Sequence, residues 1–236
     1  MDLETLLFSQ DFGSRRQCRG IVAEGRVRLG GIVRDDPDTD VPLAAPLNFE
    51  VDGQLWPYRE KAYIALNKPM GYEHSRDPQH HLSVFHLPPP QFAECGVQSV
   101  GRLDQDTTGL LLLSDDGAFL SCMPSPRPSA RCRRCIWRRS SIRSTTPKLA
   151  KLRDGVLLHG ETAPSALAAE RRDDCLLELS VLEGKYHQVK RMVAAAGNRV
   201  EKLHCECIGG YALLDTLAKG AWRWLDEADL ALLRRK

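Results

Sequence analysis

The first 48 residues alternate between apolar and polar positions in a way that predicts a small unit of helices and a hairpin. Apolar side chains recur at helical spacing around Leu3, Leu6 and Leu7, and Ser14 is suited to cap a second helix. After that helix the pattern changes to strict alternation, which predicts a short strand. The expected elements are helices at 4–12 and 15–24, a strand at 26–29 and a turn at Gly30–Gly31.

Beyond residue 60, short apolar runs bounded by turn residues predict buried strands. The segment 187–196 instead has the apolar spacing of a helix. Because strands outnumber helices and many are joined by hairpin-like turns, we expect an α+β fold on a mostly antiparallel mixed sheet. The expected strands are 62–66, 97–100, 110–113, 176–181 and 200–204. The expected organisation is a small domain at 1–48, a linker at 49–60 and a larger domain at 61–236.

Composition places the chain among globular proteins. Of its 236 residues, 42% are apolar and 27% charged, and this length is enough to bury a core. The longest apolar run, Leu110–Leu113, is far shorter than the ~20 residues that a membrane-spanning helix needs. The acidic N-terminus, Met1–Glu4, lacks the apolar stretch of a secretory signal. We therefore expect a cytoplasmic protein without a membrane partner.

The net charge of +2, from 33 basic and 31 acidic residues, does not by itself indicate a nucleic-acid-binding protein. Three arginines nevertheless gather on the second predicted helix: Arg15, Arg16 and Arg19. Two interpretations are open. The arginines form a cationic surface matched to phosphates, or they are the solvated face of a helix.

The segment 101–117 contains the strongest candidate for chemistry, Asp104. It lies in a predicted turn before an apolar strand, where a carboxylate is partly desolvated and needs a positive partner to stay ionised. Asp104 could equally be an ordinary turn-forming aspartate. Lys190 and Arg191 lie in the predicted helix 187–196, where a basic residue could face a buried carboxylate or simply face water.

Residues Phe12–Arg16 and Ile21–Gly31 resemble an S4 RNA-binding domain. Later segments resemble pseudouridine synthases, of the bacterial branch that modifies a single uridine in small-subunit ribosomal RNA. The resemblance covers most of the chain in the right order, and a seventeen-residue match around Asp104 is far more specific than a four-letter motif. The segments that carry it are Leu66–Gly71, Gly101–Gly117, Val156–Glu161, His187–Met192, Leu203–His204 and Ile208–Gly210.

The resemblance implies a mechanism. The target uridine is flipped out of the RNA, because its reacting atoms are unreachable in a base stack. Asp104 is the nucleophile that permits cleavage of the N-glycosidic bond, and the uracil rejoins the ribose through carbon. Lys190 matches the family's basic partner of the aspartate. Because the reaction is an isomerisation, the resemblance implies no cofactor and no metal.

The resemblance also implies RNA contacts. Arg102 would hold the flipped-out strand or fill the vacated space, and Lys68 and Arg191 are expected to contact phosphates. The implied partner is ribosomal RNA of the small subunit (16S), either free or in a partly assembled subunit. We expect the protein to act as a monomer.

Residues 121–147 depart from the family pattern, which has a strand with the sequence Lys-x-Tyr here, whose tyrosine stacks on the target base. The segment holds seven arginines, and the chain has no tyrosine between Tyr72 and Tyr186. One interpretation is an arginine-rich RNA-binding insertion. The other is a frameshift out and back, because all codons for Cys135-Ile136 encode Tyr or His at that junction in the shifted frame. A frameshifted product would be a catalytically impaired RNA-binding protein.

Eight cysteines raise a third alternative, a zinc module. Cys132-x-x-Cys135 and Cys205-x-Cys207 have ligand-like spacing, but the two pairs lie about seventy residues apart and lack the surroundings of a zinc ribbon. In a cytoplasmic protein of this size we expect reduced thiols.

Overall fold

The computed structural model places the chain in two compact units. The first comprises residues 1–62 and 89–97, and the second residues 63–88 and 98–236. No helix in the described part of the chain is long and apolar enough to cross a membrane. Most of the arginine-rich segment 121–147, with the suspected frameshift, lies outside the described residues. The structure describes residues 1–43, 46–94, 96–122, 146–158, 166, 168–173, 176–181 and 187–234.

The two N-terminal helices begin close to their predicted starts because each has a polar cap. Asp2 caps α1 (Leu3–Ser9) by accepting a hydrogen bond from a backbone amide at 2.7 Å. Ser14 caps α2 (Arg15–Ala23) through a capping box. Helix α1 ends at Ser9 rather than at residue 12, since Asp11 takes a left-handed conformation with φ 55°. The helices pack on each other, and their buried side chains include Leu3, Leu6, Leu7, Cys18 and Val22.

The linker predicted at 49–60 was wrong, because most of this stretch belongs to the sheet of the first unit. Its apolar residues Phe49, Val51 and Trp56 are buried. Asp52 and Gly53 both have positive φ, 53° and 76°, as a two-residue hairpin turn requires. The antiparallel order is β2 (Ile32–Arg34), β1 (Val27–Leu29), β3 (Asn48–Val51), β4 (Gln54–Pro57), and the unit also contains α3 (Pro90–Glu94).

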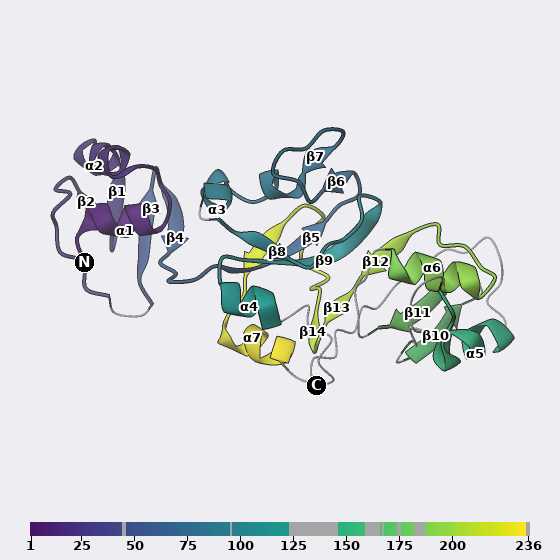
Figure 1. The fold of residues 1–236 in the computed structure, drawn as a ribbon. Coiled ribbons are helices and arrows are strands. Elements are labelled where there is room, and N and C mark those ends of the chain that lie inside the picture. Colours follow the sequence, from purple (N-terminus) through teal and green to yellow (C-terminus); the bar gives the residue numbers. More distant parts are fainter. Residues whose placement is uncertain are drawn as a thin grey trace. The chain divides into compact units, whose positions relative to one another are not determined.

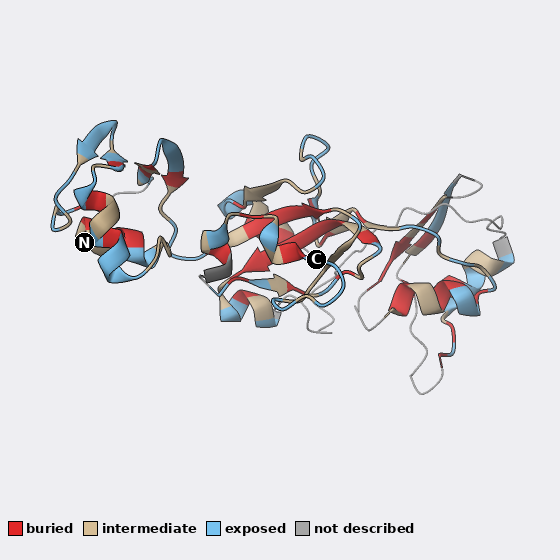
Figure 2. Cartoon of the chain, turned by 90° about the horizontal axis from the view of Figure 1, so that it is seen from above, coloured by how far each residue is buried: buried red, intermediate tan, exposed pale blue. Residues whose placement is uncertain are grey.

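The second unit is built on a five-stranded sheet in which β9 (Thr107–Ser114) pairs with three other strands. Residues Leu110–Leu113 of β9 are all buried, and Figure 2 shows that buried residues are concentrated along the strands of this sheet. One pairing is parallel and the others are antiparallel, which confirms the predicted α+β fold. The partners of β9 are β5 (Tyr63–Lys68), β8 (Gln98–Val100) and, in parallel, β12 (Leu203–Cys205), while β15 (Trp222–Trp224) pairs with β5.

Short elements surround the sheet (Figure 1). Helices α4 (Gly117–Cys122) and α7 (Glu227–Arg234) lie below it in that view, and β6 (Tyr72–Glu73) and β7 (Leu82–Ser83) lie above it. Strands β6 and β7 pair in parallel, and a 3₁₀ turn, Val84–His86, follows them. Another strand pair is β13 (Cys207–Ile208) with β14 (Tyr211–Ala212).

The same unit contains a second cluster of buried apolar residues, which Leu203 of β12 joins to the central sheet. This core packs two helices on an antiparallel hairpin and includes the completely buried Ala169, Leu179 and Met192. The helix that follows the hairpin in sequence carries Lys190, so this core determines where that side chain is held. The elements are α5 (Thr146–Asp154), β10 (Ala168–Asp173), β11 (Leu176–Ser180) and α6 (Gln188–Ala195).

Gly109 allows β9 and β12 to pair closely. Its φ is +103°, and a Cβ there would lie 2.2 Å from the carbonyl oxygen of Cys205. We expect Gly109→Ala to lower the free energy of unfolding by about 3 kcal/mol, since backbone strain and overpacking each cost about 1–3 kcal/mol. Urea denaturation measures the change. At Gly117 a Cβ meets nothing within 4 Å, so Gly117→Ala is the control, and equal stabilities would contradict the explanation.

Candidate active site

Asp104 lies in the turn 101–106, which joins β8 to β9. Gly101, with φ 75°, leads the chain out of β8. The Asp104 carbonyl accepts a hydrogen bond from the Thr107 amide at 3.0 Å, where β9 begins. The Asp104 side chain is 27% exposed. Its carboxylate is therefore partly shielded from water and still reachable from outside.

Lys68 supports this turn from the end of β5 and is completely buried. Its ammonium donates hydrogen bonds of 2.8 to 3.3 Å to four backbone carbonyls, those of Pro69, Asp104, Gln105 and Thr107. Burial lowers the pKa of Lys68 to about 8, although nearby carboxylates oppose the shift. The phosphate contact expected of Lys68 was wrong, because an ammonium enclosed in this way offers no surface to RNA. The side chain holds the turn instead.

Lys190 reaches Asp104 from α6, an element distant in sequence. Its Nζ lies 2.8 Å from Oδ2 of Asp104 and 2.7 Å from Oδ1 of Asp106. Burial opposes the charge of Lys190, but hydrogen bonds to both carboxylates outweigh it and raise the pKa above its usual value. The structure thus brings together the aspartate and the lysine that the resemblance pairs, and it adds a second carboxylate that sequence reasoning missed.

His187 is another neighbour of Asp104 to which sequence reasoning gave no role. It precedes α6 in a left-handed conformation, φ 47°, which costs about 1–2 kcal/mol for a residue other than glycine. In this position its Nε2 lies 3.3 Å from Oδ1 of Asp104. The positive end of the α6 dipole lies at the same place and favours a carboxylate. The sequence contained a signal for this contact, because His187 precedes Lys190 by three residues and a helix that starts here places both side chains on the same face.

Arg102 and Arg191 flank the ion pair in sequence. Arg102 is exposed in the turn, two residues before Asp104. Arg191 is half-buried on α6 and directly follows Lys190. The RNA contacts expected of these two arginines stay predictions.

Comparisons with known proteins identify the family. The family model for RNA pseudouridylate synthases matches residues 62–195, and that for the S4 domain matches residues 3–43. Ribosomal small subunit pseudouridine synthase A of Vibrio parahaemolyticus is 33% identical over 233 residues, which cover 98% of each chain. The chain belongs to the RNA pseudouridylate synthase family. The protein of the same name from Salmonella typhimurium is 40% identical to this synthase over 173 residues, or 72% of each chain. A crystal structure of a pseudouridylate synthase matches it with a TM-score of 0.68 at 29% identity, over 99% of each chain.

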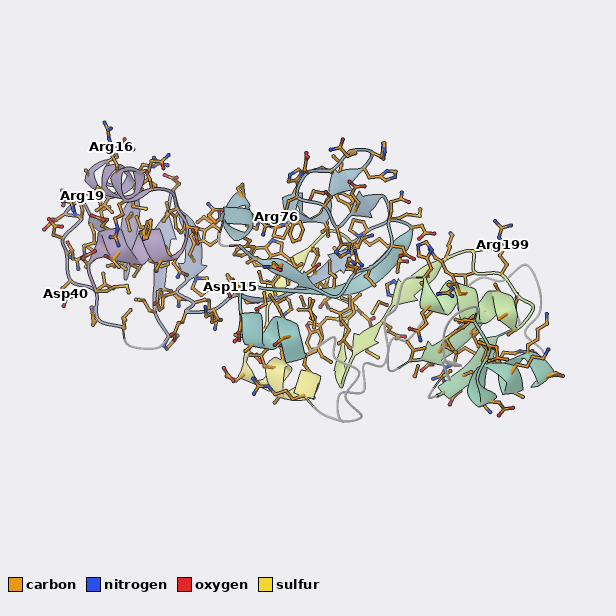
Figure 3. The ribbon with its side chains drawn as sticks, viewed as in Figure 1. Arg16, Arg19, Asp40, Arg76, Asp115 and Arg199 are labelled. Carbon is orange, nitrogen blue, oxygen red and sulfur yellow. The ribbon has the colours of Figure 1, made fainter. Side chains whose placement is uncertain are left out.

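The S4 domain of this synthase presents fewer available cations than its sequence predicts. Arg15 and Arg19 lie 3.0 and 2.7 Å from Glu4, and Arg19 also lies 3.0 Å from Asp38. Hydrogen bonds from Arg19 and then Arg15 lower the pKa of Glu4. Arg16 extends from α2 into solvent (Figure 3) and makes no ion pair with any described residue. Acidic neighbours thus partly neutralise Arg15 and Arg19, and the RNA contacts of the three arginines stay predictions.

Only two of the four cysteines proposed as zinc ligands lie among the described residues. Cys132 and Cys135 lie outside the described residues, whereas Cys205 is buried and Cys207 half-buried. Among the residues that the structure describes, no three His, Cys, Asp or Glu side chains gather in a group that could hold a metal ion.

Replacing Lys68 tests its role in the synthase. Lys68→Met keeps the apolar stem and removes the donor from four carbonyls, so we expect the free energy of unfolding to fall by about 3 kcal/mol or more. Urea denaturation measures this loss. Lys151→Met, at an exposed position of α5, is the control and should change stability by less than about 0.5 kcal/mol. If Lys68→Met were as stable as the wild type but bound RNA more weakly, the structural role would be contradicted and a phosphate contact of Lys68 would be supported.

Proposed function

We propose that this chain isomerises a uridine of small-subunit ribosomal RNA to pseudouridine, with Asp104 as the nucleophile. The observation that carries the proposal is the 2.8 Å ion pair of Asp104 with Lys190 in a chain that matches the family. A nucleophilic mechanism needs a carboxylate that is reachable yet ionised, and a partly exposed aspartate beside an ammonium meets both conditions.

The target nucleotide must leave its base stack before Asp104 can reach the ribose. Guanidinium groups bind phosphates through paired N–H donors and suit the strand on either side of a flipped nucleotide. The exposed Arg102, in the same turn as Asp104, is placed for such a contact, and Arg191 is a second candidate on α6.

The reaction rearranges one nucleotide and needs no co-reactant. An Asp104 carboxylate oxygen bonds to C1′ of the ribose as the bond between C1′ and N1 of the uracil breaks, and the electron pair of the broken bond stays with the uracil. The detached ring turns, and its C5 bonds to C1′ as the bond between C1′ and the Asp104 oxygen breaks, which frees the carboxylate. The hydrogen on C5 leaves as a proton, and N1 gains one. Lys190 keeps the carboxylate ionised and oriented, and His187 contacts its second oxygen at 3.3 Å.

Relatives named ribosomal small subunit pseudouridine synthase A support a target in small-subunit RNA. The S4 domain would dock on structured RNA, with either free 16S RNA or a partly assembled subunit as the substrate. The protein would act in the cytoplasm, where the subunit is assembled, as a monomer.

Tritium release tests the reaction, because the hydrogen on C5 is lost only when the new carbon–carbon bond forms. We expect the wild-type chain to release tritium from small-subunit RNA labelled at C5 of uridine. Asp104→Asn should reduce the rate by at least about 10³-fold, since it removes the nucleophile and keeps the side-chain shape. Lys190→Met should cost about 10²-fold, as expected for loss of one charged group that orients the reaction.

RNA affinity is the control for this experiment, and Asp104→Asn should bind RNA as the wild type does. Wild-type protein that binds RNA and releases no tritium would instead identify a catalytically impaired RNA-binding relative. That result is the one expected if the missing tyrosine between Tyr72 and Tyr186 is indispensable. Full activity of Asp104→Asn would exclude Asp104 as the nucleophile.

Arg16 provides a test of RNA binding by the S4 domain. If its unpaired guanidinium contacts one phosphate, Arg16→Gln should reduce the slope of log affinity against log salt concentration by about 1. Filter binding at several salt concentrations measures the slope. Arg16→Lys keeps the charge and should keep the slope, whereas an unchanged slope in Arg16→Gln would show that this face does not contact RNA.

A further inference from the structure

His74 is a half-buried histidine beside the turn that carries Asp104, and the proposed mechanism leaves it without a role. It directly follows β6 in the chain. Burial lowers the pKa of its imidazole to about 4, the charges of Lys68 and Arg102 act in the same direction, and Asp104 opposes them. The ring is therefore neutral at pH 7.

Both ring nitrogens have partners, and these partners determine the tautomer. The Leu103 amide donates to Nε2 at 3.1 Å, so Nε2 carries a lone pair and not a hydrogen. Nδ1 then carries the hydrogen and donates it to the Ser99 hydroxyl of β8, 3.0 Å away. A protonated ring would carry hydrogens on both nitrogens and could not accept the Leu103 amide. Burial of His74 thus preserves the hydrogen bond as well as the neutral ring.

This hydrogen bond acts one residue away from the proposed nucleophile. The carbonyl of Asp104 accepts from the Thr107 amide at 3.0 Å and from Lys68 Nζ at 3.1 Å, which fixes the C-terminal side of the residue. The Leu103 amide belongs to the peptide between Arg102 and Leu103, so its bond to His74 restrains the backbone one residue before Asp104. Because the backbone is restrained on both sides of Asp104, a shift at Leu103 would also move the Asp104 carboxylate.

We propose that His74 is a positioning residue, whose neutral Nε2 holds the Leu103 amide and so directs the Asp104 carboxylate toward the reacting nucleotide. The inference rests on the proposed function, since Asp104 must be the nucleophile for its direction to affect the rate. A displacement of about 1 Å at a reacting group can cost about 10²-fold in rate. Ser99 assists by accepting the Nδ1 hydrogen, which keeps the lone pair on Nε2.

Two amide variants separate the hydrogen bond from the space that the ring fills. In His74→Gln the side-chain oxygen can occupy the place of Nε2 and accept the Leu103 amide. In His74→Asn the shorter side chain brings its polar atoms near the place of Nδ1, toward Ser99, and leaves the Leu103 amide without an acceptor. Tritium release from C5-labelled small-subunit RNA gives kcat and KM for the wild type and both variants.

We expect His74→Asn to lose about 10- to 100-fold in kcat, with KM within about 3-fold of the wild type, because turn geometry changes while RNA contacts do not. His74→Gln should recover kcat to within about 3-fold. Equal losses in the two variants would overturn the proposal, since the effect would then follow the ring's volume. A change confined to KM would also overturn it.

Nuclear magnetic resonance on the free protein gives a readout that does not depend on catalysis. The Leu103 amide should exchange with solvent at least about 10-fold faster in His74→Asn than in the wild type or His74→Gln. The ¹⁵N chemical shifts of the His74 imidazole in the wild type should show that Nδ1 carries the hydrogen. A hydrogen on Nε2, or unchanged protection of Leu103 in His74→Asn, would overturn the proposal. If the wild type releases no tritium, the proposed function fails, and these measurements alone decide whether His74 fixes the turn.

Discussion

Four carbonyl oxygens enclose the ammonium of Lys68, and the turn that carries Asp104 depends on this arrangement. Taking an ammonium out of water is expensive, and charge-assisted hydrogen bonds offset that cost only when their geometry is good. The carbonyls must therefore converge, and their convergence shapes the turn. The pairing of β5 with β9, which sets Lys68 opposite Gly109, brings the lysine to the place where the turn closes.

The two lysines of the site have different partners and therefore different functions. Lys68 meets neutral carbonyls in a dry interior, where burial lowers its pKa, whereas Lys190 meets two carboxylates nearer the surface, which raise its pKa. The first lysine organises the backbone of the turn, although Asp106 and Asp104 lie near enough to oppose the fall in its pKa. The second places a permanent positive charge beside Asp104, and the strained conformation of His187 adds a further contact from the start of the same helix.

The sequence predicts well those features that depend on local pattern. Apolar runs located β5, β9 and β11, a polar cap located α2, and motif resemblance paired Asp104 with Lys190. It failed where distant residues decide the outcome. Arg15 and Arg19 are partly neutralised by Glu4 and Asp38, and His74 meets an amide 29 residues away. The hairpin of β3 and β4 is different, since no distant residue was needed to predict it. Its Asp52-Gly53 turn signal is present in the sequence, but the stretch was interpreted as a linker.

The second core, around α5, β10, β11 and α6, has a consequence for the order in which the protein matures. Asp104 lies in a turn between two strands of the central sheet, while Lys190 lies on a helix of the second core, and β15 near the C-terminus pairs with β5 of that sheet. During synthesis the turn that carries Asp104 leaves the ribosome long before Lys190 and before β15. A nascent chain that ends before residue 190 thus carries the Asp104 motif without the Asp104–Lys190 ion pair.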